Sequence, residues 1–88
     1  MGDEKKITKK YFEETKAKAE KGNKIAQFFL GMMYDNGEGV LEDDKEALKW
    51  FRKAADQGYA DAQNGLGRMY DFGKGVLEDD KEAVKWYH

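Results

Sequence analysis

Apolar residues recur at helical spacing in three segments of the chain, which predicts amphipathic helices. The first segment, about residues 5–21, has one stripe of mostly apolar side chains among lysines and glutamates: Ile7, Tyr11, Phe12, Thr15 and Ala19. About residues 24–35 do the same with Ala26, Leu30, Met33 and Tyr34. About residues 44–56 do it with Ala47, Trp50, Phe51, Ala54 and Ala55.

The second and third segments return at an offset of 36 residues, at about 60–71 and from residue 80 to the end of the chain. From Ala26/Ala62 to Arg52/His88, 19 of 27 aligned pairs are identical, more than shared helical composition would give. Such self-similarity predicts stacked helix pairs. We therefore expect an all-α fold: a right-handed α/α helical-hairpin repeat solenoid of about five helices.

Glycine and aspartate mark the expected helix ends, since the chain has no proline. Gly22 and Gly58 are expected in the left-handed conformation after the longer helices. Asp43 is expected to accept hydrogen bonds from the start of the next helix, with Glu46 reaching back to its backbone N–H. The equivalent helix start in the second repeat is about residues 79–82.

The link at residues 37–42 is longer than a minimal turn and contains two apolar residues, Val40 and Leu41. The second repeat has Val76 and Leu77 at the equivalent positions. We expect the link to fold back and cover the end of the hairpin core.

Small and aromatic residues are expected in the core. Gly31 and Gly67 lie within helices, where each costs about 1 kcal/mol against alanine, so a neighbouring helix backbone is expected close by. Trp50 and Trp86 are expected in the core rather than as a ligand platform. One continuous core is predicted from two equivalent sets of residues: Leu30, Met33, Tyr34, Trp50 and Phe51, with Leu66, Met69, Tyr70, Trp86 and Tyr87.

Residues 26–58 resemble a full Sel1-like repeat, the longer-looped relative of the tetratricopeptide repeat. The matching pieces are Leu30-Gly31-Met32-Met33-Tyr34, Gly37-Glu38-Gly39-Val40 and Trp50-Phe51-Arg52-Lys53-Ala54-Ala55-Asp56-Gln57-Gly58. The resemblance implies a Sel1-like, TPR-like solenoid that scaffolds protein complexes or holds peptides. Residues 1–22 then form a capping helix or degenerate half-repeat, with Glu14 where the repeats have tryptophan. Residues 23–58 form the full repeat, and 59–88 a truncated second repeat that lacks the Lys-Ala-Ala-x-x-Gly ending.

Charge and composition argue against some classes of binding partner. Sixteen Lys+Arg against 18 Asp+Glu are interleaved along the chain and give a formal net charge of -2. This argues against nucleic acid and membrane surfaces, which favour a clustered basic face. No apolar run approaches the ~20 residues of a membrane span. The absence of cysteine excludes disulfides, and, with no signal peptide evident, a cytoplasmic location is favoured.

No catalytic, cofactor or metal site is predicted, so the chain is not expected to be an enzyme. Residues 35–46 have the length of an EF-hand calcium loop, but Gly37, Gly39 and Val40 occupy ligand and glycine positions. The acidic run at residues 42–44 is better explained as a helix start, where the helix dipole favours negative charge, than as an acid/base group. His88 is the only histidine, so no histidine metal cluster or histidine-based catalytic triad is expected within one chain.

Differences between the repeats indicate a binding surface. In the first helix of each hairpin the mismatched pairs are Phe28/Asn64, Phe29/Gly65, Met32/Arg68 and Asn36/Phe72. Residues four apart share one stripe of a helix. The predicted protein- or peptide-binding residues are Phe28, Met32, Asn36, Asn64, Arg68 and Phe72. The alternative is an ordinary exposed face, or contact of Phe28 and Phe29 with the capping helix.

The end of the chain suggests a second, structural function. Val84, Trp86 and Tyr87 have no following repeat to cover them, and uncapped solenoid ends tend to associate. We expect self-association or a homodimer through this end, or fraying of the last turn. The alternative to a non-catalytic protein-binding scaffold is therefore a structural self-associating fragment, or part of a longer solenoid with no ligand of its own.

Overall fold

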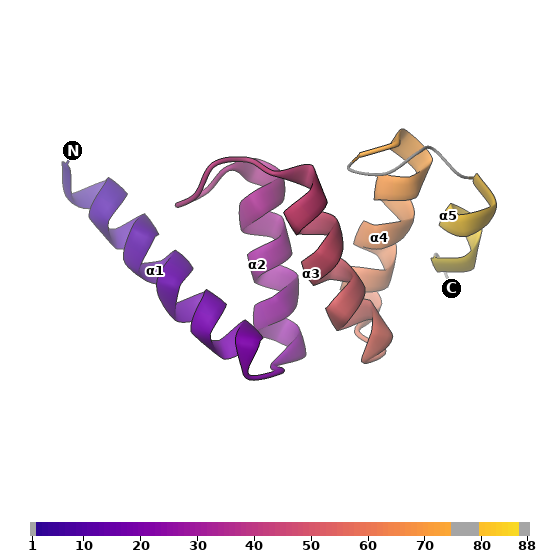
Figure 1. The fold of residues 1–88 in the computed structure, drawn as a ribbon, viewed down its shortest axis with the longest axis horizontal. Helices are drawn as coiled ribbons and strands as arrows, with labels where there is room; N and C mark the ends of the chain where they lie inside the picture. The colour runs from indigo at the N-terminus through magenta and orange to yellow at the C-terminus, as the bar shows by residue number, and fades with distance from the viewer. Residues whose placement is uncertain (1, 75–79, 87–88) are drawn as a thin grey trace.

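The computed structural model describes the backbone of residues 2–74 and 80–86, and the side chains of residues 9–74, 81, 82, 85 and 86. These residues form five α-helices and no strand: α1 (Gly2–Glu20), α2 (Lys24–Asn36), α3 (Asp44–Asp56), α4 (Ala60–Phe72) and α5 (Asp80–Trp86). Each helix packs against the next along the chain, giving an elongated row (Figure 1). The expected all-α helical-hairpin array of about five helices is confirmed.

Glycines end the helices as predicted. Gly22 has φ +98° and Gly58 has φ +83°, both in the left-handed region. Their N–H groups donate to the carbonyls of Ala19 at 3.0 Å and Ala55 at 2.9 Å. These bonds satisfy carbonyls that the last helical turn leaves without a partner.

The N-cap of α3 differs from the prediction in one respect. Asp43 Oδ1 accepts from the backbone N–H groups of Lys45 and Glu46, both at 3.1 Å, as expected. The N–H of Asp43 donates to the carbonyl of Tyr34 at 2.9 Å, so the predicted return bond from the Glu46 side chain is wrong. The bond to Tyr34 ties the end of the link to α2. The start of α5 at residue 79 lies outside the described residues.

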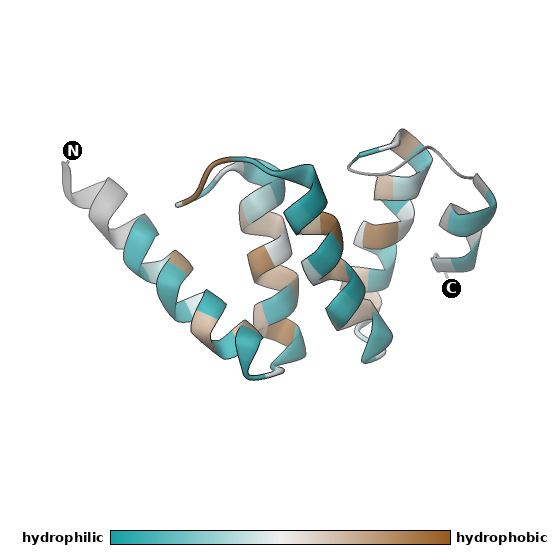
Figure 2. Cartoon of the chain, viewed as in Figure 1, coloured by the Kyte–Doolittle hydropathy of each residue, from teal (hydrophilic) through white to brown (hydrophobic). Residues whose placement is uncertain are grey.

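The link between α2 and α3 does not bury its leucine. Val40 is half-buried, but Leu41 is 88% exposed, so the predicted cover over the hairpin core is wrong for Leu41. Figure 2 shows the brown part of this link standing apart from the helices. The backbone bond from Asp43 to Tyr34 returns the link to the core without burying a leucine. Val76 and Leu77 lie outside the described residues.

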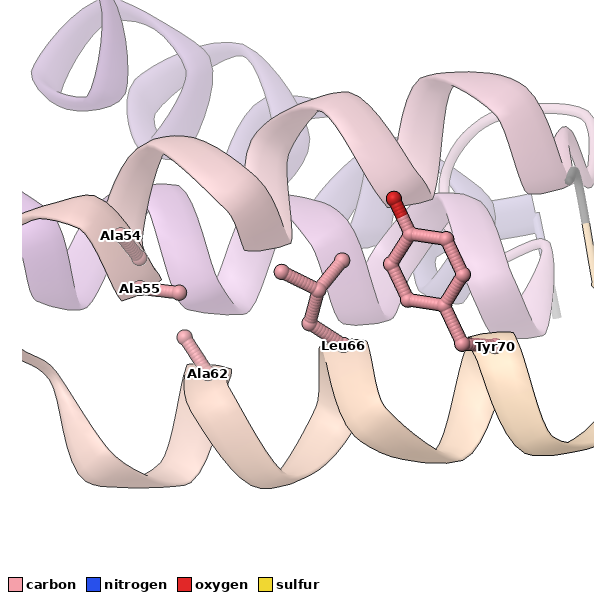
Figure 3. Close-up of a cluster of buried hydrophobic side chains, with 5 residues drawn as sticks. All are labelled: Ala54, Ala55, Ala62, Leu66 and Tyr70. Carbon is pink, nitrogen blue, oxygen red and sulfur yellow. The ribbon is translucent and has the colours of Figure 1, made fainter. Parts of the chain in front are cut away.

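The core is centred on α3, which packs against α2 on one side and α4 on the other. All five residues of its predicted apolar face are buried: Ala47, Trp50, Phe51, Ala54 and Ala55. Trp50 packs with Ala19 and Leu30. Ala54 and Ala55 lie opposite three residues that point from α4 toward α3 (Figure 3): Ala62, Leu66 and Tyr70.

Phe51 belongs to a third cluster, with Ala47 and Met69. The three clusters share half-buried side chains at their borders: Phe28, Tyr34 and Leu48. The core that was predicted to be continuous is therefore divided among three buried clusters, which these half-buried side chains connect, and Met33 is buried but belongs to none of the three. Tyr87 lies outside the described residues.

Trp50 is a core residue, as predicted, with 4% of its surface exposed. The ammonium groups of Lys49 and Lys53 lie 5.3 and 4.8 Å from the centre of its ring. These lysines cover the ring with their charges still near solvent.

The phenyl ring of Phe51 fits between two glycines. A methyl group added to Gly31 of α2 would lie 2.7 Å from Cδ1 of Phe51, whereas one added to Gly65 of α4 would lie at 3.7 Å. The neighbour of Gly31 is thus a side chain, and the predicted close helix backbone is wrong there. At the 36-residue offset, Phe51 corresponds to Thr15 and Gly65 to Phe29, so the first helix pair carries the small residue on α1 and the large one on α2. Gly67 is also buried.

Helix α1 lies on α2 as α3 lies on α4. The Gln27 side-chain amide donates to the Ala19 carbonyl at 3.1 Å, and the Gln63 amide donates to the Ala55 carbonyl at 3.2 Å. Gln57 Nε2 donates to Gln27 Oε1 at 2.8 Å, joining the end of α3 to α2. Side-chain amides therefore fasten the same edge of each helix pair.

The apolar stripe of α1 is only partly buried. Thr15 and Ala19 are buried and Phe12 is half-buried, but Tyr11 is 52% exposed. Tyr11 therefore does not join the core that the stripe predicted. The side chain of Ile7 lies outside the described residues.

We expect Trp50→Ala to remove ~3–5 kcal/mol of stability, because it deletes a large buried aromatic side chain. A domain of this size has ~0.05–0.15 kcal/mol per residue in total, so the variant should be largely unfolded. Urea titration followed by circular dichroism measures this. Lys53→Ala is the control, since its contact with the same ring contributes ~1 kcal/mol or less. A wild-type midpoint for Trp50→Ala would contradict the assignment.

The two glycines around Phe51 should respond oppositely to alanine. Gly31→Ala should destabilise, because the collision with the ring costs ~1–3 kcal/mol and exceeds the gain of about 1 kcal/mol in helix propensity. Gly65→Ala meets only ordinary van der Waals contact and should stabilise by up to ~1 kcal/mol. The difference in urea midpoint between the variants is the measurement. Equal stabilisation by both would mean that Phe51 is not held tightly against α2.

Candidate binding groove between α2 and α4

The six predicted partner-binding residues all line one groove of about 430 Å³. Helix α2 contributes Phe28, Met32 and Asn36, and helix α4 contributes Asn64, Arg68 and Phe72. Phe51 and Met69, both buried, also line it. The structure thus brings together every residue of the predicted stripe.

The repeat itself creates this arrangement. Helices α2 and α4 run in the same direction, with α3 antiparallel between them (Figure 1). Equivalent positions of the two helices therefore line the same groove, and each equivalent pair is called a rung. The first rung is Phe28 and Asn64, the second is Met32 and Arg68, and the third is Asn36 and Phe72.

Aromatic contacts fix the first rung. Phe28 is half-buried, with its ring centre 5.7 Å from that of Phe51 and 5.4 Å from that of Tyr59. These contacts lie on the α3 and α4 side, so they do not favour the alternative that Phe28 packs on the first helix. Phe29 lies at its edge, at 5.6 Å, and is exposed. Phe28 is both a wall of the groove and part of the core.

The third rung presents an exposed aromatic side chain. Phe72 is the last residue of α4 and is 69% exposed, while Asn36 on α2 is also exposed. An aromatic ring in this position can add apolar contact to a ligand in the groove.

An ion pair crosses the groove near its third rung. Lys74 Nζ lies 2.6 Å from Asp35 Oδ1, joining the link after α4 to α2. The hydrogen bond to Asp35 raises the pKa of Lys74 above its ordinary value. Sequence comparison missed this pair, although a signal existed: residue 38 in the first link is Glu and its counterpart is Lys74.

The remaining charges of the groove are Asp61 and Arg68 of α4. Asp61 lies in the first turn of its helix, where a negative charge is favoured by the helix dipole. Within the part of the chain that the structure describes, Arg68 forms no ion pair. Its guanidinium can therefore donate to a ligand.

Among the described residues, no three His, Cys, Asp or Glu side chains are placed to hold a metal ion. No described helix is long and apolar enough to cross a membrane. Asp43, from the acidic run at residues 42–44, caps α3.

Trp86, one of the predicted self-association residues, is half-buried. It packs against the cluster that contains Ala54 and Leu66, and its Nε1 donates to Glu82 Oε1 at 3.3 Å. The side chain of Val84 and all of Tyr87 lie outside the described residues.

Comparison with models of known protein families identifies the family of this chain. The Sel1 repeat model matches residues 24–59 and 60–88, which is most of the chain. The chain belongs to the Sel1 repeat family. Proteins of this family are generally non-catalytic scaffolds that mediate protein–protein interactions. A comparison with curated protein sequences gives no significant match.

Solved Sel1 repeat structures have the same arrangement of helices. A Sel1 repeat protein from Oxalobacter formigenes matches 90% of this chain at 37% identity, with a TM-score of 0.88. A protective antigen from uropathogenic Escherichia coli with an SLR fold matches 86% at 45% identity, with a TM-score of 0.83. Cysteine rich protein B of Helicobacter pylori matches 88% at 32% identity, with a TM-score of 0.83.

This chain spans only 23%, 16% and 58% of those three chains, respectively. The third is described as cysteine rich, whereas this chain has no cysteine. Packing and hydrogen bonds hold this Sel1 repeat array together without disulfides.

The Asp35–Lys74 pair predicts a loss of stability at high pH. Because the folded pKa of Lys74 is raised, its contribution is complete below the ordinary value of 10.5 and is lost as the pH rises through the raised pKa. The pKa of Tyr34 is also raised, first by burial and then by nearby carboxylates, and adds a loss in the same direction. Lys74→Gln should cost ~0.2–1 kcal/mol at pH 7, as partly exposed pairs do.

The difference in urea midpoint between wild type and Lys74→Gln, measured from pH 7 to 12, isolates the lysine, because Tyr34 titrates in both proteins. This difference should shrink above pH 10.5. A difference that stays constant to pH 12 would show that the ion pair does not stabilise the fold.

Proposed function

We propose that this Sel1 repeat module binds a peptide or an exposed protein segment in the groove between α2 and α4, without catalysis. One observation supports this most strongly. Over residues 26–36 of α2 and 62–72 of α4, most residues that the two repeats share are buried, whereas seven of the eight residues that differ line a single groove.

The chemistry of the groove suits a peptide. Its volume of about 430 Å³ lies in the range of ligand sites, ~300–1,000 Å³. Phe51 and Met69 supply buried apolar surface, and Asn64 and Arg68 supply hydrogen-bond donors. Phe, Met and Arg are enriched at protein interfaces, where aromatic and arginine side chains contribute most of the binding energy.

The second candidate is self-association through the end of the row. Trp86 is half-buried at this end, against the cluster between α3 and α4. A second copy that covered Trp86, with Val84 and Tyr87, would complete its burial and give a homodimer. This role needs no ligand in the groove.

Selection from a random peptide library displayed on phage tests the groove. The wild-type module should enrich peptides that a triple variant, Met32→Ser with Arg68→Ser and Phe72→Ser, fails to bind. Phe28 is left intact, because its contacts with Phe51 and Tyr59 belong to the core. The matched control replaces three partly exposed apolar residues outside the groove by serine: Tyr11, Ile25 and Leu41.

The groove variant should keep the helicity of wild type and lose binding, while the control should keep both. Binding that survives in the groove variant would overturn the proposal. Sedimentation of the same proteins compares the two candidates: dimers that form equally in wild type and groove variant, with no enriched peptide, would favour the structural role.

A further inference from the structure

The rungs of the groove match the repeat of an extended peptide. Successive rungs on one helix are four residues apart, a rise of about 6 Å. In an extended segment, side chains on the same side recur every two residues, at about 6.6–6.8 Å. A segment lying along the groove can therefore place one side chain at each rung of a wall without changing its backbone.

The two walls of the groove differ in polarity. On the first two rungs the α2 wall presents Phe28 and Met32, while the α4 wall presents Asn64 and Arg68. An extended segment sends alternate side chains to opposite sides. Apolar residues of a bound segment would face α2, and the polar residues between them would face α4.

The charges of the groove differ from rung to rung. Lys74 neutralises Asp35, so this pair leaves no net charge near the third rung. Asp61, beside the first rung, disfavours an acidic residue next to Asn64. Arg68 at the second rung has no ion-pair partner among the described residues and lies about 10 Å along the helix from Asp61, about one Debye length at 0.1 M salt.

On the basis of the proposed function, we propose that the groove selects an extended segment of alternating apolar and polar residues, with an acidic residue opposite Arg68. Apolar side chains occupy the Phe28 and Met32 side. A neutral polar residue faces Asn64. Specificity comes from the order of the residues as well as from their composition.

Three five-residue peptides with blocked ends test this order. The first is Leu-Gln-Leu-Glu-Leu, which follows the alternation. The second, Leu-Leu-Leu-Gln-Glu, has the same composition and charge without the alternation. The third, Leu-Gln-Leu-Gln-Leu, lacks the acidic residue. Titration of the isotope-labelled chain by NMR gives the dissociation constants and locates the perturbed amides.

We expect the first peptide to bind at least fivefold more tightly than either of the others, with the largest shifts around Met32, Asn64 and Arg68. Arg68→Met removes the positive charge and leaves methionine on both walls of the second rung, since Met32 lies on the other wall. This variant should lose the preference for the first peptide over the third and keep the preference over the second. Its unchanged helicity is verified by circular dichroism.

Equal affinity for all three peptides, no binding by any of them, or shifts outside the groove would each overturn the alternation. A preference for the first peptide over the third that persists in Arg68→Met, or that is absent from wild type, would overturn the role of Arg68. Groove-dependent binding of library peptides would in those cases leave the proposed function standing. Absence of library binding as well would remove both.

Discussion

The contact between Phe51 and Gly31 sets the geometry on which the rest of this structure depends. The ring of a residue on α3 rests against the backbone of α2, and it does so only because Gly31 has no side chain. On the other side, Gly65 leaves room for the same ring beside α4. A side chain at Gly31 would push α2 and α3 apart, because a well-packed core tolerates little added volume.

The same ring links stability to the proposed binding surface. Phe51 is buried in the cluster with Ala47 and Met69 and also lines the groove. Phe28 has a similar double role through its ring contacts. These two rings are held by core contacts, so a bound segment would meet part of the groove surface already fixed in place. Such preorganisation lowers the entropic cost of binding.

Much of this could be predicted from sequence because the two repeats act as an internal comparison. Spacing of apolar residues located the helices, and the mismatches between the first helices of the repeats located six of the residues that line the groove. Predictions failed where a residue had alternatives that periodicity does not distinguish. Leu41 follows the hydrophobic pattern, yet a backbone bond from Asp43 to Tyr34 closes the link without it.

The other errors have the same origin. The N–H of Asp43 donates to the carbonyl of Tyr34 instead of to the Glu46 side chain. The space beside Gly31 is filled by the ring of Phe51 instead of by a helix backbone. The pair of Asp35 and Lys74 joins residues 39 positions apart, and only the stacking of the hairpins brings them together. Sequence periodicity describes which face of a helix is buried, but it does not say which atoms meet across that face.

The polar interactions that join neighbouring helices differ between the two ends of α2 and α4. Near the starts of α2 and α4, neutral amides hold the helices: Gln27 and Gln63 bond to backbone carbonyls, and Gln57 bonds to Gln27. Near their ends, the tie across the groove is the ion pair between Asp35 and Lys74. Salt screens charges on a partly exposed pair far more than it weakens neutral hydrogen bonds. The tie near the third rung is therefore weakened by salt while the amide bonds near the first rung are not, so the two edges of the helix row respond differently to ionic strength.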